Sequence, residues 1–178
     1  MRFSRMAAGA ALVAATALVV PAAASAATAS AATASTAGWQ PFRTAPWTDA
    51  PGAVCSFGVA ATPVDDEEQF RTLASYPNGD PRLQEFRGPL FVQYTNMSNG
   101  ASVVRDLSGY GWFHYGSDGS IDAFIASHIG VTVAVGNAGF SAGEWVISGR
   151  SELTLSSSGT IGVRLIDATA ENLCQTLS

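Results

Sequence analysis

The sequence contains no lysine and is poor in charged residues of either sign. Of its 178 residues 13% are charged, and nine arginines against 14 acidic residues give a formal net charge of −5. A typical globular protein has about 25% charged residues. A nucleic-acid-binding protein needs a basic stripe that neutralises phosphates. The composition therefore excludes nucleic acid as a partner.

Recognisable catalytic and metal-binding motifs are also missing. His114 and His128 are the only histidines, and neither belongs to a His-x-His or His-Glu-x-x-His motif. An Asp-rich calcium loop and the Gly-x-Ser-x-Gly motif of serine hydrolases are absent as well. The sequence therefore predicts no catalytic residue, no metal site and no cofactor.

Apolar residues, by contrast, are abundant and occur along the whole chain. They make up 47% of the sequence, and aromatic residues make up 10%. Acidic disordered chains lack such apolar runs, and the length fits one domain with at most a tail. The sequence therefore predicts a single folded, acidic domain.

Residues 1–26 have the order of a secretory signal peptide. Arg2 and Arg5 precede an apolar stretch from Met6 to Val20, and small residues follow at Ala24-Ser-Ala26. The apolar stretch has about 15 residues, whereas a membrane-spanning helix needs about 20. We expect cleavage after Ala26 and a secreted, extracellular product without a stable membrane anchor. An uncleaved anchor is the alternative.

Residues 27–51 predict a flexible segment rich in Ala, Thr, Ser and Pro. The repeated Ala-Ala-Thr-Ala motif at its start buries little apolar area. Trp39, Phe42 and Trp47 follow among three prolines. These aromatic side chains either cover one end of the domain or remain exposed to bind a partner. We favour covering, because large exposed apolar patches are uncommon on soluble monomers.

From residue 52 onward, apolar and polar residues alternate with a period of two, which is typical of half-buried β-strands. Asn-Gly, Asp-Gly and Ser-Gly pairs between the runs predict tight turns. Strands are predicted at residues 53–61, 67–76, 82–87, 89–95, 101–108, 111–116, 120–126, 129–135, 144–149, 151–156 and 160–166.

Residues 52–178 are therefore predicted to form an all-β domain. Because some adjacent runs can form one bent strand, we expect an antiparallel barrel of about eight or nine strands, with a sandwich as the alternative. Closure would remove exposed edges, which this chain has no lysine to protect. A short C-terminal helix is predicted after Asp167, where Leu173 and Leu177 are spaced i, i+4.

Two cysteines, Cys55 and Cys174, stand near the two ends of the predicted domain. An even number of cysteines in a secreted chain favours a disulfide, and two distant thiols are too few for a metal site. We expect a bridge that joins the C-terminal helix to the first strand.

Several short motifs resemble a group of uncharacterised secreted actinobacterial proteins. They are Cys55-Ser-Phe-Gly-Val, Gly88-Pro-Leu-Phe-Val-Gln-Tyr-Thr-Asn96, Leu107-Ser-Gly109, Ser117-Asp-Gly-Ser and Glu171-Asn-Leu-Cys174. The all-β pattern is also similar in architecture to allene-oxide-cyclase-like and lipocalin-like barrels. The resemblance implies a compact barrel. It assigns no functional residue, because its motifs are turns and cysteines.

Trp112 and His114 are candidate ligand-binding residues because they share one face of a predicted strand. If that face points inward, they line an aromatic cavity with one titratable group, to which Tyr94 also contributes. The alternative is that His114 lies on the outer face or is a core residue that contributes nothing to binding.

Arg105 is the fourth candidate. It alternates with Asp106 on a predicted strand, so a charged side chain points inward whichever face is buried. A buried charge is costly unless it is paired. Arg105 either pairs with an acid such as Glu144 or Asp122, or binds an anionic ligand group.

Two classes of function fit these features. The first is a non-enzymatic secreted module that binds a small apolar molecule or an extracellular protein. The second is a cofactor-free cyclase or isomerase that acts inside an aromatic cavity. The first is favoured, because the sequence offers no acid–base pair.

Overall fold

The computed structural model describes residues 38–133, 140–155 and 161–178. These residues form eleven strands and one short helix, so the all-β prediction is confirmed. The elements are β1 (Gln40–Pro41), β2 (Trp47–Asp49), β3 (Val59–Asp66), β4 (Gln69–Ser75), β5 (Pro81–Gly88), β6 (Leu90–Asn96), β7 (Ser102–Asp106), β8 (Gly109–Tyr115), β9 (Ile121–Val133), β10 (Gly143–Leu155), β11 (Ile161–Asn172) and α1 (Leu173–Thr176). The predicted signal peptide and residues 27–37 lie outside the described residues.

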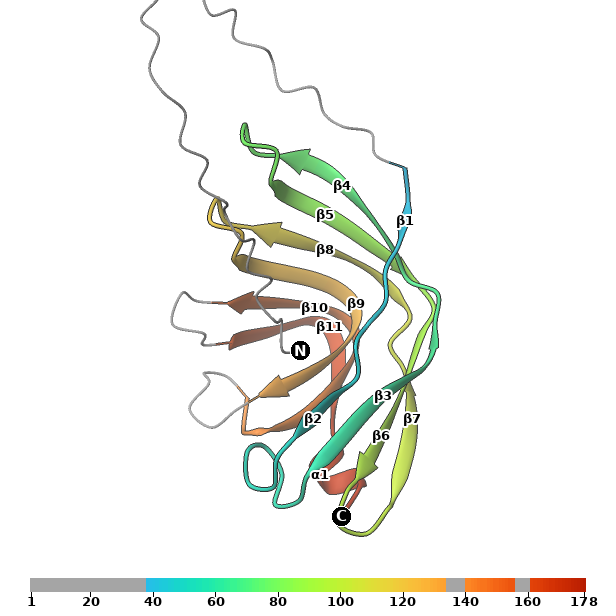
Figure 1. Ribbon diagram of the computed structural model, residues 1–178. Helices are drawn as coiled ribbons and strands as arrows, with labels where there is room; N and C mark the ends of the chain where they lie inside the picture. Colours follow the sequence, from blue (N-terminus) through green and yellow to red (C-terminus); the bar gives the residue numbers. More distant parts are fainter. Residues whose placement is uncertain (1–37, 134–139, 156–160) are drawn as a thin grey trace, which may run out of the picture.

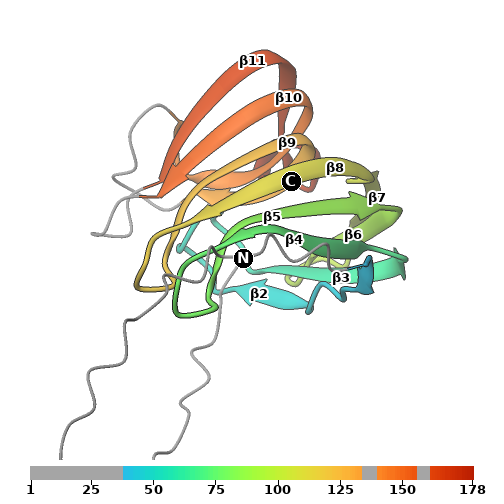
Figure 2. The same cartoon turned by 90° about the horizontal axis from the view of Figure 1, so that it is seen from above.

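The strands form two antiparallel sheets (Figure 1). A seven-stranded sheet has the order β1-β4-β5-β8-β9-β10-β11, and a four-stranded sheet has the order β2-β3-β6-β7. Figure 2 shows the large sheet curving from β4 to β11, which leaves a concave inner face.

After β2, the chain passes between the two sheets at three sharp corners. Residues 67–68 separate β3 from β4, Pro89 separates β5 from β6, and residues 107–108 separate β7 from β8. Gly88 has a φ of +134°, and a Cβ there would lie 2.6 Å from the carbonyl oxygen of Glu67. Only glycine allows the two backbones to approach so closely.

The barrel predicted from the sequence is not closed in the described part of the chain. After the corner at residues 107–108, β8 pairs with β9, whereas β7 pairs only with β6. The strands therefore separate into two sheets. The arrangement is sandwich-like, which agrees with the alternative to the barrel. Strands β3 to β11 agree with the predicted eight or nine strands, whereas β1 and β2 lie before residue 52, where no strand is predicted.

Two pairs of predicted strands are continuous in the structure. As far as they are described, the runs 120–126 and 129–135 fall on β9, and the runs 144–149 and 151–156 fall on β10. A register shift between Ser148 and Ser151 bends this ladder without breaking it. Gly149, at a φ of +101°, lies within the irregularity, where a side chain would collide with the Asp167 carbonyl.

The predicted helix at the C-terminus is shorter than expected. β11 continues through Asp167 to Asn172, and α1 has only four residues. Asn172 caps the helix, since its side chain accepts a hydrogen bond from the Cys174 backbone N–H. The predicted disulfide is confirmed: Cys55 and Cys174 are bridged, with a Cα–Cα distance of 5.3 Å.

The segment before residue 52 is part of the sheets, as far as it is described. β1 pairs with β4 at one edge of the large sheet, and β2 pairs with β3 at one edge of the small sheet. Figure 1 shows β1 and β2 running in succession from one sheet to the other. We call residues 38–51 the N-terminal strap. The strands of the strap therefore belong to the same two sheets as the strands after residue 52.

Candidate functional site

A partly enclosed cavity of about 290 Å³ lies between the concave face of the large sheet and the N-terminal strap. We call it the main cavity. Its volume is at the lower end of the range for small-molecule sites, about 300–1,000 Å³. Most of its walls are apolar. The lining residues are Trp47, Thr48, Asp49, Ala53, Val54, Phe113, Ile121, Phe124, Ile129, Gly130, Val131, Thr132, Leu153, Leu155 and Ile161.

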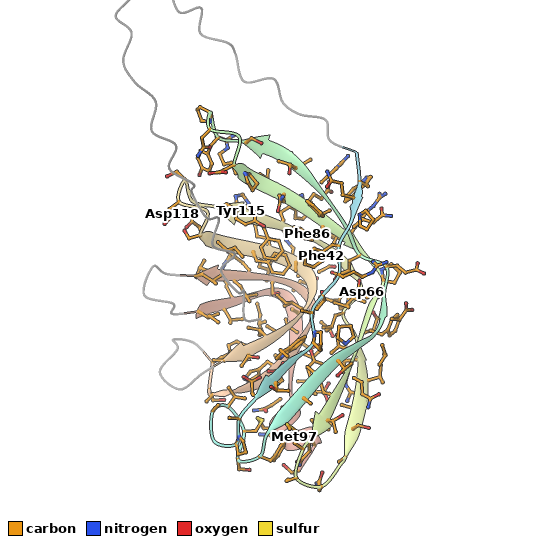
Figure 3. All side chains as sticks on the ribbon, in the orientation of Figure 1. Phe42, Asp66, Phe86, Met97, Tyr115 and Asp118 are labelled. Carbon is orange, nitrogen blue, oxygen red and sulfur yellow. A yellow bond between two sulfur atoms is a disulfide. The ribbon has the colours of Figure 1, made fainter. Side chains whose placement is uncertain are left out.

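A second cavity, of about 230 Å³, shares Phe113 and Phe124 with the main cavity. Its other lining residues are Phe42, Glu68, Phe70, Gln84, Phe86 and Tyr115. The shared rings stack with a centroid distance of 4.0 Å. Phe42 of the strap lies edge-on to Phe86 at 5.1 Å, and Figure 3 shows these two rings close together. The two cavities are therefore separated by a thin aromatic wall.

One end of the main cavity is polar. The Thr132 hydroxyl on β9 donates a 2.6 Å hydrogen bond to Oε2 of Glu144 on β10, and lies 3.4 Å from Oδ2 of Asp49 on β2. Thr132 and Asp49 line the cavity, whereas Glu144 is behind them, with an exposed fraction of 0%. We call these three side chains the acceptor cluster.

The carboxyl group of Glu144 titrates near neutrality. The pKa is raised to about 7, mainly by burial; the hydrogen bond from Thr132 lowers it, and the nearby negative charge of Asp49 raises it. Burial dominates because the charged form loses its hydration. Glu144 therefore changes its charge within the physiological range.

Three buried polar atoms around this end have no hydrogen-bond partner among the described residues. They are Trp47 Nε1, the Tyr94 hydroxyl and Glu144 Oε1. Tyr94 packs edge-on against Trp47 at 5.9 Å, and a Cβ on Gly130 would collide with its hydroxyl. Burial and the charge of Glu144 raise the pKa of Tyr94 far above its usual range. Native structures rarely leave such buried atoms unpaired.

The four residues predicted from the sequence do not come together. Tyr94 is fully buried beside the main cavity but does not line it. Arg105 on β7 makes two 2.7 Å hydrogen bonds to Glu171 on β11, and not to Glu144 or Asp122. The expected pairing of Arg105 is thus present, with a different acid.

Trp112 and His114 lie on the face of β8 opposite to the cavities. His114 is exposed, and Trp112 packs edge-on against Tyr110 at 5.4 Å. Phe113 and Tyr115, which alternate with them, line the second cavity. The exposed His114 matches the outer-face alternative, and because both faces of this strand are aromatic, the pattern contains no signal that shows which face points inward.

Sequence reasoning missed the acceptor cluster as a site. The sequence suggests Glu144 only as a partner for Arg105, and it places Asp49 in the predicted flexible segment. One signal was available. Glu144 and Val146 share a strand face in a run with few polar residues, so a buried carboxyl could have been expected at this position.

The remaining observations concern metals, membranes and relatives. No group of three or more metal-ligating side chains occurs among the residues that the structure describes. Within the same residues, no helix is long and apolar enough to cross a membrane. Comparisons with protein-family models, curated proteins and solved structures find no match. The similarity to secreted actinobacterial proteins stays a prediction.

Proposed function

We propose that this protein is a secreted, non-enzymatic binding protein that holds a small, mainly apolar molecule in the main cavity. The observation that supports this most directly is the cavity itself, with apolar walls and one polar end formed by Asp49 and Thr132. Such a combination is typical of small-molecule sites.

Burial of apolar surface would supply most of the affinity. Each methylene group removed from water contributes about 0.8 kcal/mol. After the cost of association is subtracted, a medium-chain ligand reaches micromolar affinity, which corresponds to a binding free energy of about −8 kcal/mol. The aromatic wall of Phe113 and Phe124 offers a flat apolar surface to the ligand body.

Binding is favoured over catalysis because of the position of Glu144. This carboxyl has the pKa of a general base, about 7, but it is fully buried behind Thr132 and does not line the cavity. A general base must reach the proton that it abstracts. The cyclase or isomerase alternative therefore has less support than binding.

Tryptophan fluorescence tests the binding proposal. Trp47 lines the main cavity, and Trp112 lies on the opposite face of β8 and provides a matched control. A panel of medium-chain aliphatic and terpenoid compounds is titrated into the secreted protein. We expect saturable quenching that Trp47→Phe abolishes and Trp112→Phe retains. Quenching by no compound, or quenching lost only in Trp112→Phe, would overturn the proposal.

Secretion is proposed from the signal peptide and is consistent with the disulfide. The mass of the exported protein tests it directly. We expect a mature chain that begins at Ala27, with cleavage after Ala31 as the second choice. Recovery of the full-length chain from the cell fraction alone would contradict export.

A further inference from the structure

The acceptor cluster points to the chemistry of the ligand's polar end. This inference rests on the proposed function. We infer that the ligand carries a protonated amine, which binds between Asp49 and Thr132 while the apolar body of the ligand fills the main cavity.

The first argument is that the acceptor cluster itself offers the cavity no free hydrogen-bond donor. Thr132 has a single hydroxyl proton, and the shorter of its two contacts directs that proton to Glu144, at 2.6 Å rather than 3.4 Å. The lone pairs of Thr132 and the carboxylate of Asp49 then face the cavity as acceptors. A ligand with two or three N–H donors satisfies them, whereas an anion does not.

The second argument is charge. None of the four ion pairs formed by the described residues involves Asp49 or Glu144. Among the described residues, the two carboxyl groups thus share one hydroxyl without an ion-pair partner, and Oε1 of Glu144, in a side chain with no exposed surface, has no hydrogen bond. A cation beside Asp49 and Thr132 would offset this negative potential.

The third argument is the wall next to the acceptors. Trp47 and Asp49 are on the same short strand, and both line the cavity. An ammonium group beside an indole ring gains a cation–π interaction. A bare divalent ion fits poorly, because it prefers six or more oxygen ligands and most of this cavity is apolar.

A matched series of ligands tests the inference. Octylamine, 1-octanol and octanoate have the same chain length and different polar ends. Isothermal titration of the full secreted protein measures their affinities at pH 7.5. We expect octylamine to bind about tenfold more tightly than octanol, since a charge-assisted hydrogen bond is about twice as strong as a neutral one. Octanoate should bind most weakly, because Asp49 repels it.

Two variants localise the effect. Asp49→Asn keeps the shape of the side chain and should reduce octylamine affinity about tenfold without changing octanol affinity. Asp122→Asn, on the exposed part of β9, is the matched control and should change neither. Unchanged octanol binding in Asp49→Asn also shows that the cavity is intact.

The outcomes separate this inference from the proposed function. If octanol or octanoate binds as tightly as octylamine, or if Asp49→Asn leaves the preference for the amine intact, the amine assignment is overturned and the apolar site stands. If none of the three ligands binds, the inference is overturned together with the proposal on which it rests.

Discussion

At the scale of single residues, Glu144 has the most unusual environment. It is a carboxyl without exposed surface that shares a hydroxyl with Asp49 and has one oxygen without a partner. Leaving a buried charge so weakly compensated lowers stability. The same group should therefore make the stability of the domain depend on pH.

Replacing Glu144 by glutamine should remove that dependence. The folded-state pKa is raised from 4.5 to about 7, so the folded protein holds this proton more tightly than the unfolded chain. The stability gained from binding this proton more tightly in the folded state is fully present below about pH 4.5. It is lost as the pH rises through about 7. Glu144→Gln should therefore increase the free energy of unfolding at pH 8 relative to the natural chain, by up to about 3 kcal/mol.

Urea unfolding at pH 5 and pH 8 measures this effect. The exposed Glu67→Gln is the control and should leave the pH dependence as it is. If Glu144→Gln changes the free energy of unfolding equally at pH 5 and at pH 8, the carboxyl does not titrate near neutrality in the folded state.

Arg105, which the sequence suggests as a ligand-binding residue, forms an ion pair between two strands instead. Its ion pair with Glu171 joins β7 to β11, and the two side chains are 31% and 35% exposed. Such partly exposed pairs contribute about 1 kcal/mol or less. Arg105→Gln should therefore lower the free energy of unfolding by no more than that and leave ligand affinity within about twofold. A large loss of ligand binding in this variant would restore Arg105 to the site.

At the scale of elements, the N-terminal strap contributes to both cavities. Phe42 lines the second cavity, and Trp47 and Asp49 line the main one. Trp39 is also engaged, since the guanidinium groups of Arg71 and Arg87 lie 4.6 Å and 3.8 Å from its ring. These contacts favour covering of the domain end over an exposed partner-binding arm.

A chain that begins at Gly52 should therefore lose ligand binding and part of its stability. Removing the strap uncovers aromatic surface, so we expect strong binding of a hydrophobic dye, a lower unfolding midpoint and no ligand affinity. A chain that begins at Gly38 is the matched control and should behave like the mature protein. If the shorter chain still binds the ligand, the strap does not form part of the site.

The same elements show what the sequence could predict. Alternation located most strands within a few residues, because burial on one face imposes a period of two. Alternation did not show which face of β8 points inward, since Trp112 and Phe113 are both large aromatic residues. It also ended β9 early at Ser127 and His128, where polar side chains suggested a break but the backbone continues.

The acceptor cluster was beyond the reach of local patterns for a different reason. Asp49, Thr132 and Glu144 come from β2, β9 and β10, and Asp49 is 83 residues from Thr132. Their proximity depends on how the strap crosses between the two sheets. A short strand among prolines carries too few residues to display a period, so the sequence predicts a flexible segment there.

At the scale of the whole molecule, the disulfide is the longest-range covalent constraint that the structure describes. It joins the segment after β2 to the helix after β11, across a sequence separation of 119. Asn96 reinforces the same region, because its side-chain amide donates to the Leu177 carbonyl at 2.8 Å. Together they hold the C-terminus against the small sheet.

Replacing Cys55 and Cys174 together by serine should cost a large part of the stability. For a loop of about 100 residues, the chain-entropy model gives about 4.7 kcal/mol. Chemical unfolding of the double variant beside the oxidised protein measures the loss. Native mass after thiol alkylation should show no modified cysteine; two alkylated cysteines would contradict the bridge.

The curved large sheet also has an open side with consequences for self-association. Within the described residues, β11 pairs as a strand only with β10, and its Leu165 and Ile166 are 39% and 40% exposed. Such an edge is a template for uncontrolled pairing with another chain. The bulge opposite Arg150 and Ser151 interrupts its register, and Arg164 and Asp167 flank the apolar pair with charges of opposite sign. These irregularities and charges protect an edge that the chain has no lysine to guard, and they oppose the growth of fibrils along it.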